Sequence, residues 1–311
     1  MASRRWLISA RADFWFVSAG AALALLGALA LIAFHGDTEL DLTDFVLSEF
    51  HLGATYDAVI RRRLWRRLPS DVVIVPSIIL IATFALITAN SWLIVSSIAM
   101  YAAIWHRGRQ NFGIARYYQR LQNGPVSAVH SRLFTGAIYA PMLAAAFLFS
   151  HLSPDAYEGD PYFALSLGTT VAWGTGIIAL GWVCSYLIWA CTRKKDQGRE
   201  LHPGEIWVVL AHAVAFGSAY VLGATHASFL FVLAVHHEVQ YLYFTYALAR
   251  KNNNSEIRFA ASFALWPLLT FGTTMLSNFS QVQWLASLGV AGLFCHYWLD
   301  GRIWTRRAMA P

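Results

Sequence analysis

The chain has 311 residues, of which 57% are hydrophobic and 13% are charged, and its formal net charge is +6. Soluble domains carry about 25% charged residues, so this composition argues against a soluble domain and predicts an all-α polytopic membrane protein. The positive charges cluster between apolar runs, which is typical of a membrane-orientation signal and excludes a nucleic-acid partner. The three cysteines lack CxxC spacing, which argues against a disulfide framework or a thiolate metal site.

Ten membrane-spanning helices are predicted, within a single transmembrane domain that covers 1–311. The first apolar run follows Arg4, Arg5 and Arg11 and is too long for the apolar part of a signal peptide, so it is predicted to be the first span. The second run is the most polar, because it contains several acidic residues and His51. In chain order, the predicted spans are 13–34, 42–60, 71–89, 92–114, 132–152, 163–192, 205–222, 224–249, 257–277 and 282–304.

The basic clusters predict the orientation of these spans. With ten spans, clusters such as "RRRLWRR" (61–67), "RKKDQGR" (193–199) and "RIWTRR" (302–307) all fall on one side, whereas the acidic loop "SPDAYEGDP" (153–161) falls on the other. Because loops rich in lysine and arginine stay in the cytoplasm, both termini are predicted to be cytoplasmic. In a bacterium, the membrane would be the inner (plasma) membrane.

Histidines with polar partners recur on four of the predicted spans. "WHRGRQ" places His106 and Gln110 four residues apart, "HHEVQ" does the same for His236 and Gln240, and "CHYWLD" for His296 and Asp300. Residues four apart share one helix face. The second span adds His51 and Asp57 in "FHLGATYD". Ionisable residues at membrane depth are costly and usually functional, so this pattern predicts a site.

Imidazole and carboxylate groups without thiolates are typical of iron, copper, manganese or zinc sites. We expect iron, with two ions, and the other three metals remain alternatives. His236 and His237 point about 100° apart on a helix. Both can reach one metal centre only if that centre is wide, such as two metals, or if one of them does not bind the metal directly. The predicted metal ligands are His51, His106, His236, His237, His296, Asp57 and Asp300.

The remaining polar groups receive supporting roles. We expect Gln110, Gln240 and His212 to orient the ligands from behind, since hydrogen-bonded partners fix metal-bound rings. Three roles stay open for Glu238, namely ligand, catalytic base or partner of Arg109, and Tyr241 is a candidate catalytic residue beside a packing role. Arg107 and Arg109 are predicted to hold an acidic headgroup of the substrate. Other histidines, including His130, His202 and His226, are expected to have ordinary interfacial or helix-bridging roles.

A histidine-rich site on the cytoplasmic side of a helical membrane protein loosely resembles the membrane-bound non-haem di-iron oxygenases, which include alkane monooxygenases and fatty-acid desaturases and hydroxylases. The "HH" at 236–237, the histidines on other helices and the nearby acidic groups carry the resemblance. The histidine boxes HxxxH and HxxHH of those families do not occur in this sequence. The resemblance implies O2-dependent oxidation of a lipid-soluble substrate, with electrons from a separate donor protein.

Two other classes of protein remain open. A proton- or ion-coupled transporter would use the histidines and acidic residues as a relay. A b-type haem or quinone redox protein would use two histidines from facing helices as axial ligands. Metal analysis combined with an optical spectrum separates the three classes.

Overall fold

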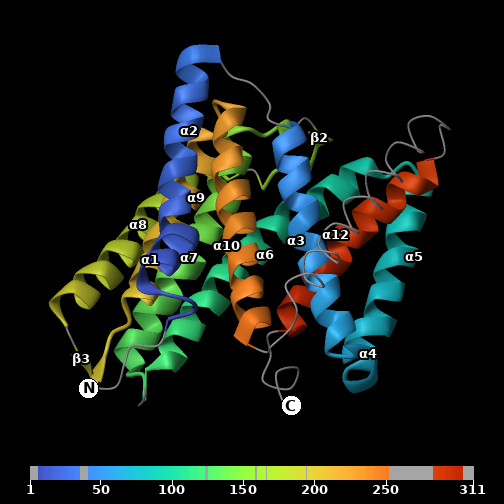
Figure 1. Cartoon of the computed structure of the whole chain (residues 1–311). Helices are drawn as coiled ribbons and strands as arrows, with labels where there is room; N and C mark the ends of the chain where they lie inside the picture. Colours follow the sequence, from blue (N-terminus) through green and yellow to red (C-terminus); the bar gives the residue numbers. More distant parts are fainter. Residues whose placement is uncertain are drawn as a thin grey trace. The chain divides into compact units, whose positions relative to one another are not determined.

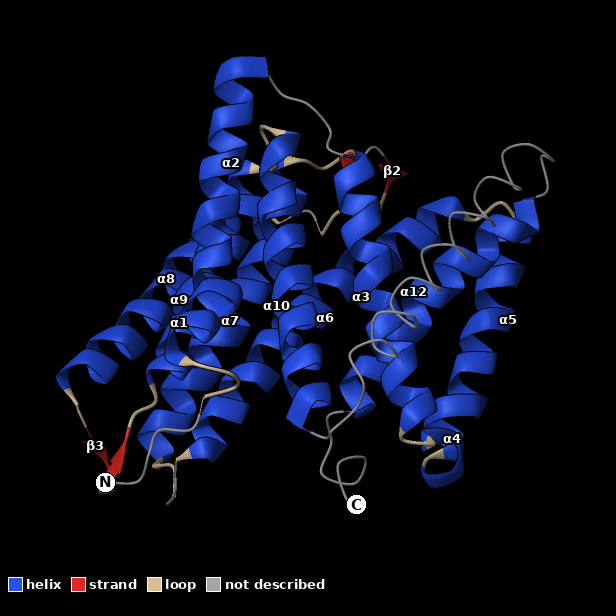
Figure 2. Ribbon diagram, viewed as in Figure 1, coloured by secondary structure: helices blue, strands red, loops and turns tan. Residues whose placement is uncertain are grey.

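The structure is a computed structural model that describes residues 6–35, 41–122, 125–157, 160–165, 167–193, 195–251 and 283–303. Helices make up nearly all of these ranges, which confirms the predicted all-α class (Figure 2). The chain divides into two compact units. The first unit comprises Met1–Asp44, Arg107–Pro154 and Ala164–Ala247, and the second comprises Phe45–His106, Asp155–Phe163 and Leu248–Pro311. The single domain expected over 1–311 stays a prediction.

The first unit contains the N-terminal helices and most of the middle of the chain (Figure 1). Its helices and strands are α1 (Ala10–Asp13), the π-helix η1 (Phe14–Ala19), α2 (Gly20–His35), α7 (Ala128–Leu152), α8 (Thr169–Thr192), β3 (Lys195–Asp196), β4 (Arg199–Glu200), α9 (Pro203–Gly217), η3 (Ser218–Leu222), η4 (Ala227–Phe229) and α10 (Leu230–Lys251), the last up to Ala247.

The second unit contains α3 (Asp41–Arg61), which enters it at Phe45, and α12 (Gln283–Ile303). Its other elements are α4 (Leu64–Arg67), η2 (Ser70–Ile74), α5 (Val75–Thr88), β1 (Ala156–Tyr157) and β2 (Asp160–Pro161). The helix α6 (Trp92–Leu121) contributes residues up to His106 to this unit and the rest to the first unit.

Small residues let α7 and α8 pack closely in the first unit. A Cβ atom on Gly136 would lie 2.3 Å from the ring of Trp182, and one on Gly176 would lie 2.9 Å from Leu148. Alanines such as Ala144 line the same contact. Close approach of this kind is how helices associate in lipid, where there is no hydrophobic force between helices.

The start of the chain is tied to the first unit by the buried carboxylate of Asp13. It accepts hydrogen bonds from the main-chain N–H groups of Leu7 and Ile8, at 2.8 and 3.1 Å. It also accepts them from the hydroxyls of Tyr118 and Tyr243, at 2.9 and 2.5 Å. A buried carboxylate is stable only when hydrogen-bonded, so these four donors allow Asp13 to be fully buried.

A β-hairpin positions Asp196 in the first unit. Strands β3 and β4 pair antiparallel through Asp196 and Arg199. Both residues of the turn between them have positive φ, 49° for Gln197 and 82° for Gly198, as the tightest hairpin turns require. The carboxylate of Asp196 then accepts a hydrogen bond from the main-chain N–H of Ser127 at 2.9 Å. Burial raises the pKa of Asp196, but the hydrogen bonds from Ser127 and the charge of His130 outweigh it and lower that pKa.

His130 lies between two carboxylates. Its Nδ1 is 3.1 Å from Asp196 and its Nε2 is 2.5 Å from Glu205, and the ring is fully buried. Glu205 also accepts hydrogen bonds from Gln119 at 2.8 Å and Tyr186 at 2.9 Å. We call this the Asp196–His130–Glu205 cluster. His130 was expected to have an ordinary interfacial role, and the fold brings two acidic residues from later in the chain against its buried ring.

The described residues include five helical segments that are long and apolar enough to cross a membrane. These segments indicate an integral membrane protein, and their outward side chains agree: Ile81 on α5 is 68% exposed and Ile177 on α8 is 70% exposed. The segments are Ala10–Phe34, Ser70–Thr88, Ala128–Leu152, Thr169–Thr192 and Pro203–Leu222.

The structure supports fewer spans than the ten predicted. The predicted span 257–277 lies outside the described residues, and each of the others coincides with a helix. The helices α3, α6, α10 and α12 are long enough to span, but each contains charged residues and histidine within its length, which lowers its apolarity. The predicted span 163–192 begins as a helix only at Thr169.

Candidate metal centre

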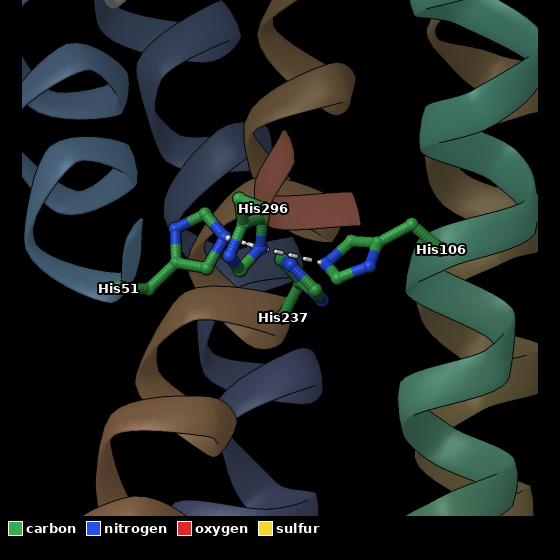
Figure 3. A group of neighbouring side chains, drawn as sticks. All are labelled: His51, His106, His237 and His296. Atoms are coloured by element: carbon green, nitrogen blue, oxygen red, sulfur yellow. Dashed lines mark hydrogen bonds between the residues drawn. The ribbon is translucent and has the colours of Figure 1, made fainter. Parts of the chain in front are cut away.

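Three histidines of the second unit converge from three helices. His51 lies on α3, His106 on α6 and His296 on α12. All three rings are buried: His51 and His106 are 3% exposed, and His296 is fully buried. Figure 3 shows the ring of His296 between those of His51 and His106. We call these residues the three-histidine cluster.

The Nε2 atoms of the three-histidine cluster lie close together. His296 Nε2 lies 3.0 Å from His51 Nε2 and also 3.0 Å from His106 Nε2. A nitrogen of neutral imidazole is either a donor with one hydrogen or an acceptor with one lone pair. His296 Nε2 therefore cannot make a good hydrogen bond to both neighbours at once. Three lone pairs directed at one cation resolve this conflict.

The spacing of these nitrogens fits a metal. Histidine nitrogens bind zinc at roughly 2.0–2.1 Å, so two ligands of one such ion lie about 2.9–3.4 Å apart for angles from 90° to tetrahedral. The two 3.0 Å separations fall within this range. Imidazole suits iron, copper, nickel and zinc, so the spacing fits a metal without selecting one.

The Nδ1 side of His106 faces Asp300. The carboxylate of Asp300 lies 3.8 Å from His106 Nδ1, and both groups are buried. Tyr297 stacks on the ring of His106, with 4.7 Å between the ring centres. A carboxylate behind a metal-binding histidine fixes which nitrogen carries the proton. This position suits Asp300 for orienting His106. The direct ligand role predicted for Asp300 stays a prediction.

Contacts within the second unit set the position of His296 on α12. The hydroxyl of Tyr56, on α3, donates to the main-chain oxygen of Gly292 at 2.8 Å, one turn before His296. The indole of Trp298 donates to the main-chain oxygen of Asp71 at 2.9 Å. These bonds fix α12 against α3 and η2 on both sides of the ligand residue. Rigid helices of this kind hold metal ligands more precisely than loops do.

The histidines of the second unit each offer one ligand atom. The ligand atoms of His51, His106 and His296 all lie within 4.8 Å of one another. These three buried histidines could therefore hold a metal ion. His237 is buried on α10 in the first unit, and its predicted ligand role stays a prediction.

An amide network supports the turn of α10 that carries His237. Gln110 donates to the main-chain oxygen of His237 at 2.8 Å and to the side-chain oxygen of Gln240 at 3.1 Å. Gln240 in turn donates to Asn111 at 3.1 Å and to the main-chain oxygen of Val17 at 3.0 Å. Gln110 thus bonds to the α10 backbone, and Gln240 joins α10 to α6 and η1. The ligand-orienting role predicted for both stays a prediction.

The other predicted ligands, and His212, have contacts of their own. The carboxylate of Asp57 forms an ion pair with Arg61, one turn along α3. His236 is buried on α10, and His212, which was expected to orient ligands, donates from Nε2 to the main-chain oxygen of Ile138 at 3.0 Å. Among the described residues of the second unit, Asp57 and Asp300 are not part of the group of converging ligand atoms.

The predicted catalytic and headgroup residues have mixed surroundings. Glu238 and Tyr241 are buried on α10, each 1% exposed. Arg109 is exposed, donates to the hydroxyl of Tyr139 at 2.5 Å and lies over the ring of Phe112. Arg107 is half-buried, and its main-chain oxygen accepts a hydrogen bond from Asn111. Their proposed roles stay predictions.

Some residues in the structure were not expected from the sequence. Tyr297 stacks on the ring of His106, with 4.7 Å between the ring centres. Glu205 lies in "HPGE" at 202–205, at the start of α9. The histidine in that motif does cap α9, accepting from the N–H of Gly204 at 3.0 Å. The partner of Glu205 lies 75 residues earlier, and no local pattern announces it.

Comparison of the chain with models of protein families, with curated proteins and with solved structures finds no match. The proposals below rest on the residues and their geometry.

Proposed function

We propose that the chain is a membrane-embedded metalloenzyme that uses O2 to oxidise a lipid-soluble substrate. His51, His106 and His296 bind the metal through Nε2, and the metal is iron. The observation that carries this proposal is the convergence of three buried Nε2 atoms at 3.0 Å spacings. Ordinary hydrogen bonding does not explain two such contacts at one nitrogen.

The residues of the chain have separate tasks in this proposal. The three histidines hold the metal, Asp300 keeps His106 in the tautomer whose lone pair is on Nε2, and Gln110 fixes the α10 backbone at His237. Burial of the rings excludes bulk water. When bound, iron with open coordination positions supplies the activation of O2.

The reaction class sets what else is needed. Insertion of one oxygen atom into a C–H bond leaves the second atom to be reduced to water, which consumes two electrons and two protons. Desaturation with full reduction of O2 to two waters likewise needs two electrons and two protons beyond those removed from the substrate. A separate electron donor must supply them, as the resemblance to the non-haem di-iron oxygenases also implies.

The topology belongs to the same proposal. Ten spans place all the basic clusters, and both termini, on the cytoplasmic side. A reporter fused after Pro311 should therefore read as cytoplasmic. A thiol-reactive reagent that does not cross membranes should fail to label a cysteine introduced at Gln197 in intact cells. Labelling from outside would contradict the orientation.

Asp300→Asn should weaken metal binding by roughly 10–100-fold, the usual effect of removing a carboxylate that orients a metal-bound histidine. Asparagine keeps the size of the side chain but loses the charge that faces His106 Nδ1. Metal titration of the purified variant measures the change. Asp160→Asn, at an exposed position of β2, is the matched control and should bind metal like the unchanged protein. Equal affinity in both variants would show that Asp300 does not act on the metal through His106.

The experiment that tests the function begins with metal analysis and the optical spectrum of the purified protein. We expect iron at a stoichiometric level and no Soret band. With reduced ferredoxin as the electron donor and phospholipid vesicles as the substrate source, O2 uptake should accompany an oxidised lipid product. A Soret band would identify a haem protein. Failure to bind any metal, even when metal is added, would contradict the proposed centre.

A further inference from the structure

An apolar groove runs along the second unit beside the three-histidine cluster. It has a volume of about 350 Å³, within the range of roughly 300–1,000 Å³ usual for ligand pockets. Its walls come from α3, from η2 and α5, and from α12. The residues used below are Tyr56, Pro76, Leu80, Leu288, Gly292 and Cys295.

The length of the groove matches one leaflet of a membrane. On α12 its wall extends from Leu288 to Leu299, a distance of eleven helical steps of about 1.5 Å each, or roughly 16.5 Å in total. The hydrocarbon core of a bilayer is about 30 Å thick, so one leaflet is roughly 15 Å. The wall therefore has the length of a hydrocarbon chain that reaches from the membrane surface to the midplane.

The surface that the walls present to the groove is apolar. The hydroxyl of Tyr56 is engaged by the main-chain oxygen of Gly292 at 2.8 Å, and the thiol of Cys295 points to the main-chain oxygen of Pro76 at 3.6 Å. The polar atoms of these residues are thus directed into the wall. The rim residues Leu80 and Leu288 are 40% and 41% exposed. In a membrane, the groove opens to lipid.

One end of the groove is polar. Arg302 lies three residues after Leu299, on the same face of α12, and its Nε is 3.5 Å from the carboxylate of Asp71. The guanidinium also lies 4.3 Å from the centre of the Trp298 ring. Arg302 belongs to the basic cluster at 302–307, which the orientation rule places at the cytoplasmic surface. This end therefore lies where lipid headgroups are.

The groove and the three-histidine cluster share helix α12. Cys295 lines the groove and is followed directly by His296, while Gly292 lies one turn before His296. Along the helix, His296 is about 9 Å from Arg302, since six residues rise about 1.5 Å each. The metal ligand His296 thus lies level with the middle of a hydrocarbon chain in the groove, if the polar end of that chain is at Arg302.

We infer that this groove binds one acyl chain of a membrane phospholipid, drawn from the cytoplasmic leaflet, with its headgroup at the Asp71–Arg302 end. The inference rests on the proposed function and names its substrate class, a phospholipid acyl chain oxidised at a mid-chain carbon. The surrounding lipid supplies this occupant without any release into water.

The test uses the full chain in vesicles of phosphatidylcholine that include a phosphatidylcholine with a diazirine in the middle of one acyl chain. After illumination, mass spectrometry locates the adducts. We expect adducts on Ala291 and Cys295, which are 1% and 8% exposed and face the groove. Lipid that merely surrounds the protein labels outward residues such as Ile177 instead.

Two matched variants on α5 sharpen the test. Leu80→Trp fills the groove, whereas Ile81→Trp places the same ring on the neighbouring residue, which is 68% exposed. We expect Leu80→Trp to lower the adducts on Ala291 and Cys295 at least fivefold and Ile81→Trp to leave them unchanged. Adducts confined to outward residues, or equal adducts in the two variants, would overturn the inference. So would removal of the adducts by added palmitic acid, which would make the occupant a free fatty acid.

This experiment is independent of the metal, because labelling needs no turnover. Adducts in the groove of a protein that binds no metal would support the groove and contradict the proposed function. A protein that binds metal but gives no adducts in the groove would contradict only the inference that the groove binds an acyl chain.

Discussion

His296→Ala should abolish metal binding. His296 Nε2 is the one nitrogen of the three-histidine cluster that lies 3.0 Å from both of the others, so its removal takes away the central donor. Loss of an orienting partner typically weakens binding by about 10–100-fold, and we expect loss of this ligand to exceed that range. Metal content of the purified variant, measured by mass spectrometry, gives the result.

The control for His296→Ala is His151→Ala, which removes a half-buried histidine of α7 in the first unit. This variant should keep its full metal content. Gln110→Ala should fall between the two, because Gln110 bonds to the main-chain oxygen of His237 and not to a ring. Full metal occupancy in the His296→Ala protein would show that the three-histidine cluster does not bind the metal, and would contradict the proposed function.

His130→Ala should destabilise the fold more than most single substitutions, while leaving the metal bound. The variant leaves the carboxylates of Asp196 and Glu205 buried without the imidazole between them. Removing one partner of a buried charged pair costs about 3–5 kcal/mol. The free energy of unfolding, or the thermal midpoint in detergent, measures the loss, and metal content is measured on the same sample.

A second substitution separates the cluster from simple loss of packing. If repulsion and desolvation of the bare carboxylates cause the loss, adding Glu205→Gln to His130→Ala should recover part of the stability, since residues in one network are coupled. His226→Ala, at an exposed position, serves as the control and should change stability little. A thermal midpoint for His130→Ala equal to that of His226→Ala would be inconsistent with an energetic role for the cluster.

Two features could be predicted from the sequence: an all-α membrane protein, and a candidate site built from histidine nitrogens. Apolar runs separated by basic clusters predict helices, and the described helices begin and end close to the predicted residues; α3, for example, covers Asp41–Arg61 where a span was predicted at 42–60. Such runs are local properties of the chain, because a helix needs about 20 apolar residues to cross the hydrocarbon core. Histidine without spaced cysteine likewise predicted nitrogen ligands.

The membership of the site was decided by tertiary structure. The repeated pattern on four spans treated the histidines alike, yet in the second unit it is the packing of three helices that brings His51, His106 and His296 together. The same pattern paired His296 with Asp300, whereas the carboxylate lies behind His106 on another helix.

Sequence separation explains this limit. The 3.0 Å contacts of His296 join it to residues 245 and 190 positions away, and His130 meets Glu205 across 75 positions. A helical repeat fixes which residues share a face, but it carries no information on which faces meet. That choice depends on how α3, α6 and α12 pack within the second unit, and on how α7 and α9 pack within the first. The sequence by itself determined the helices and the ligand chemistry, and the packing of the helices decided which side chains meet.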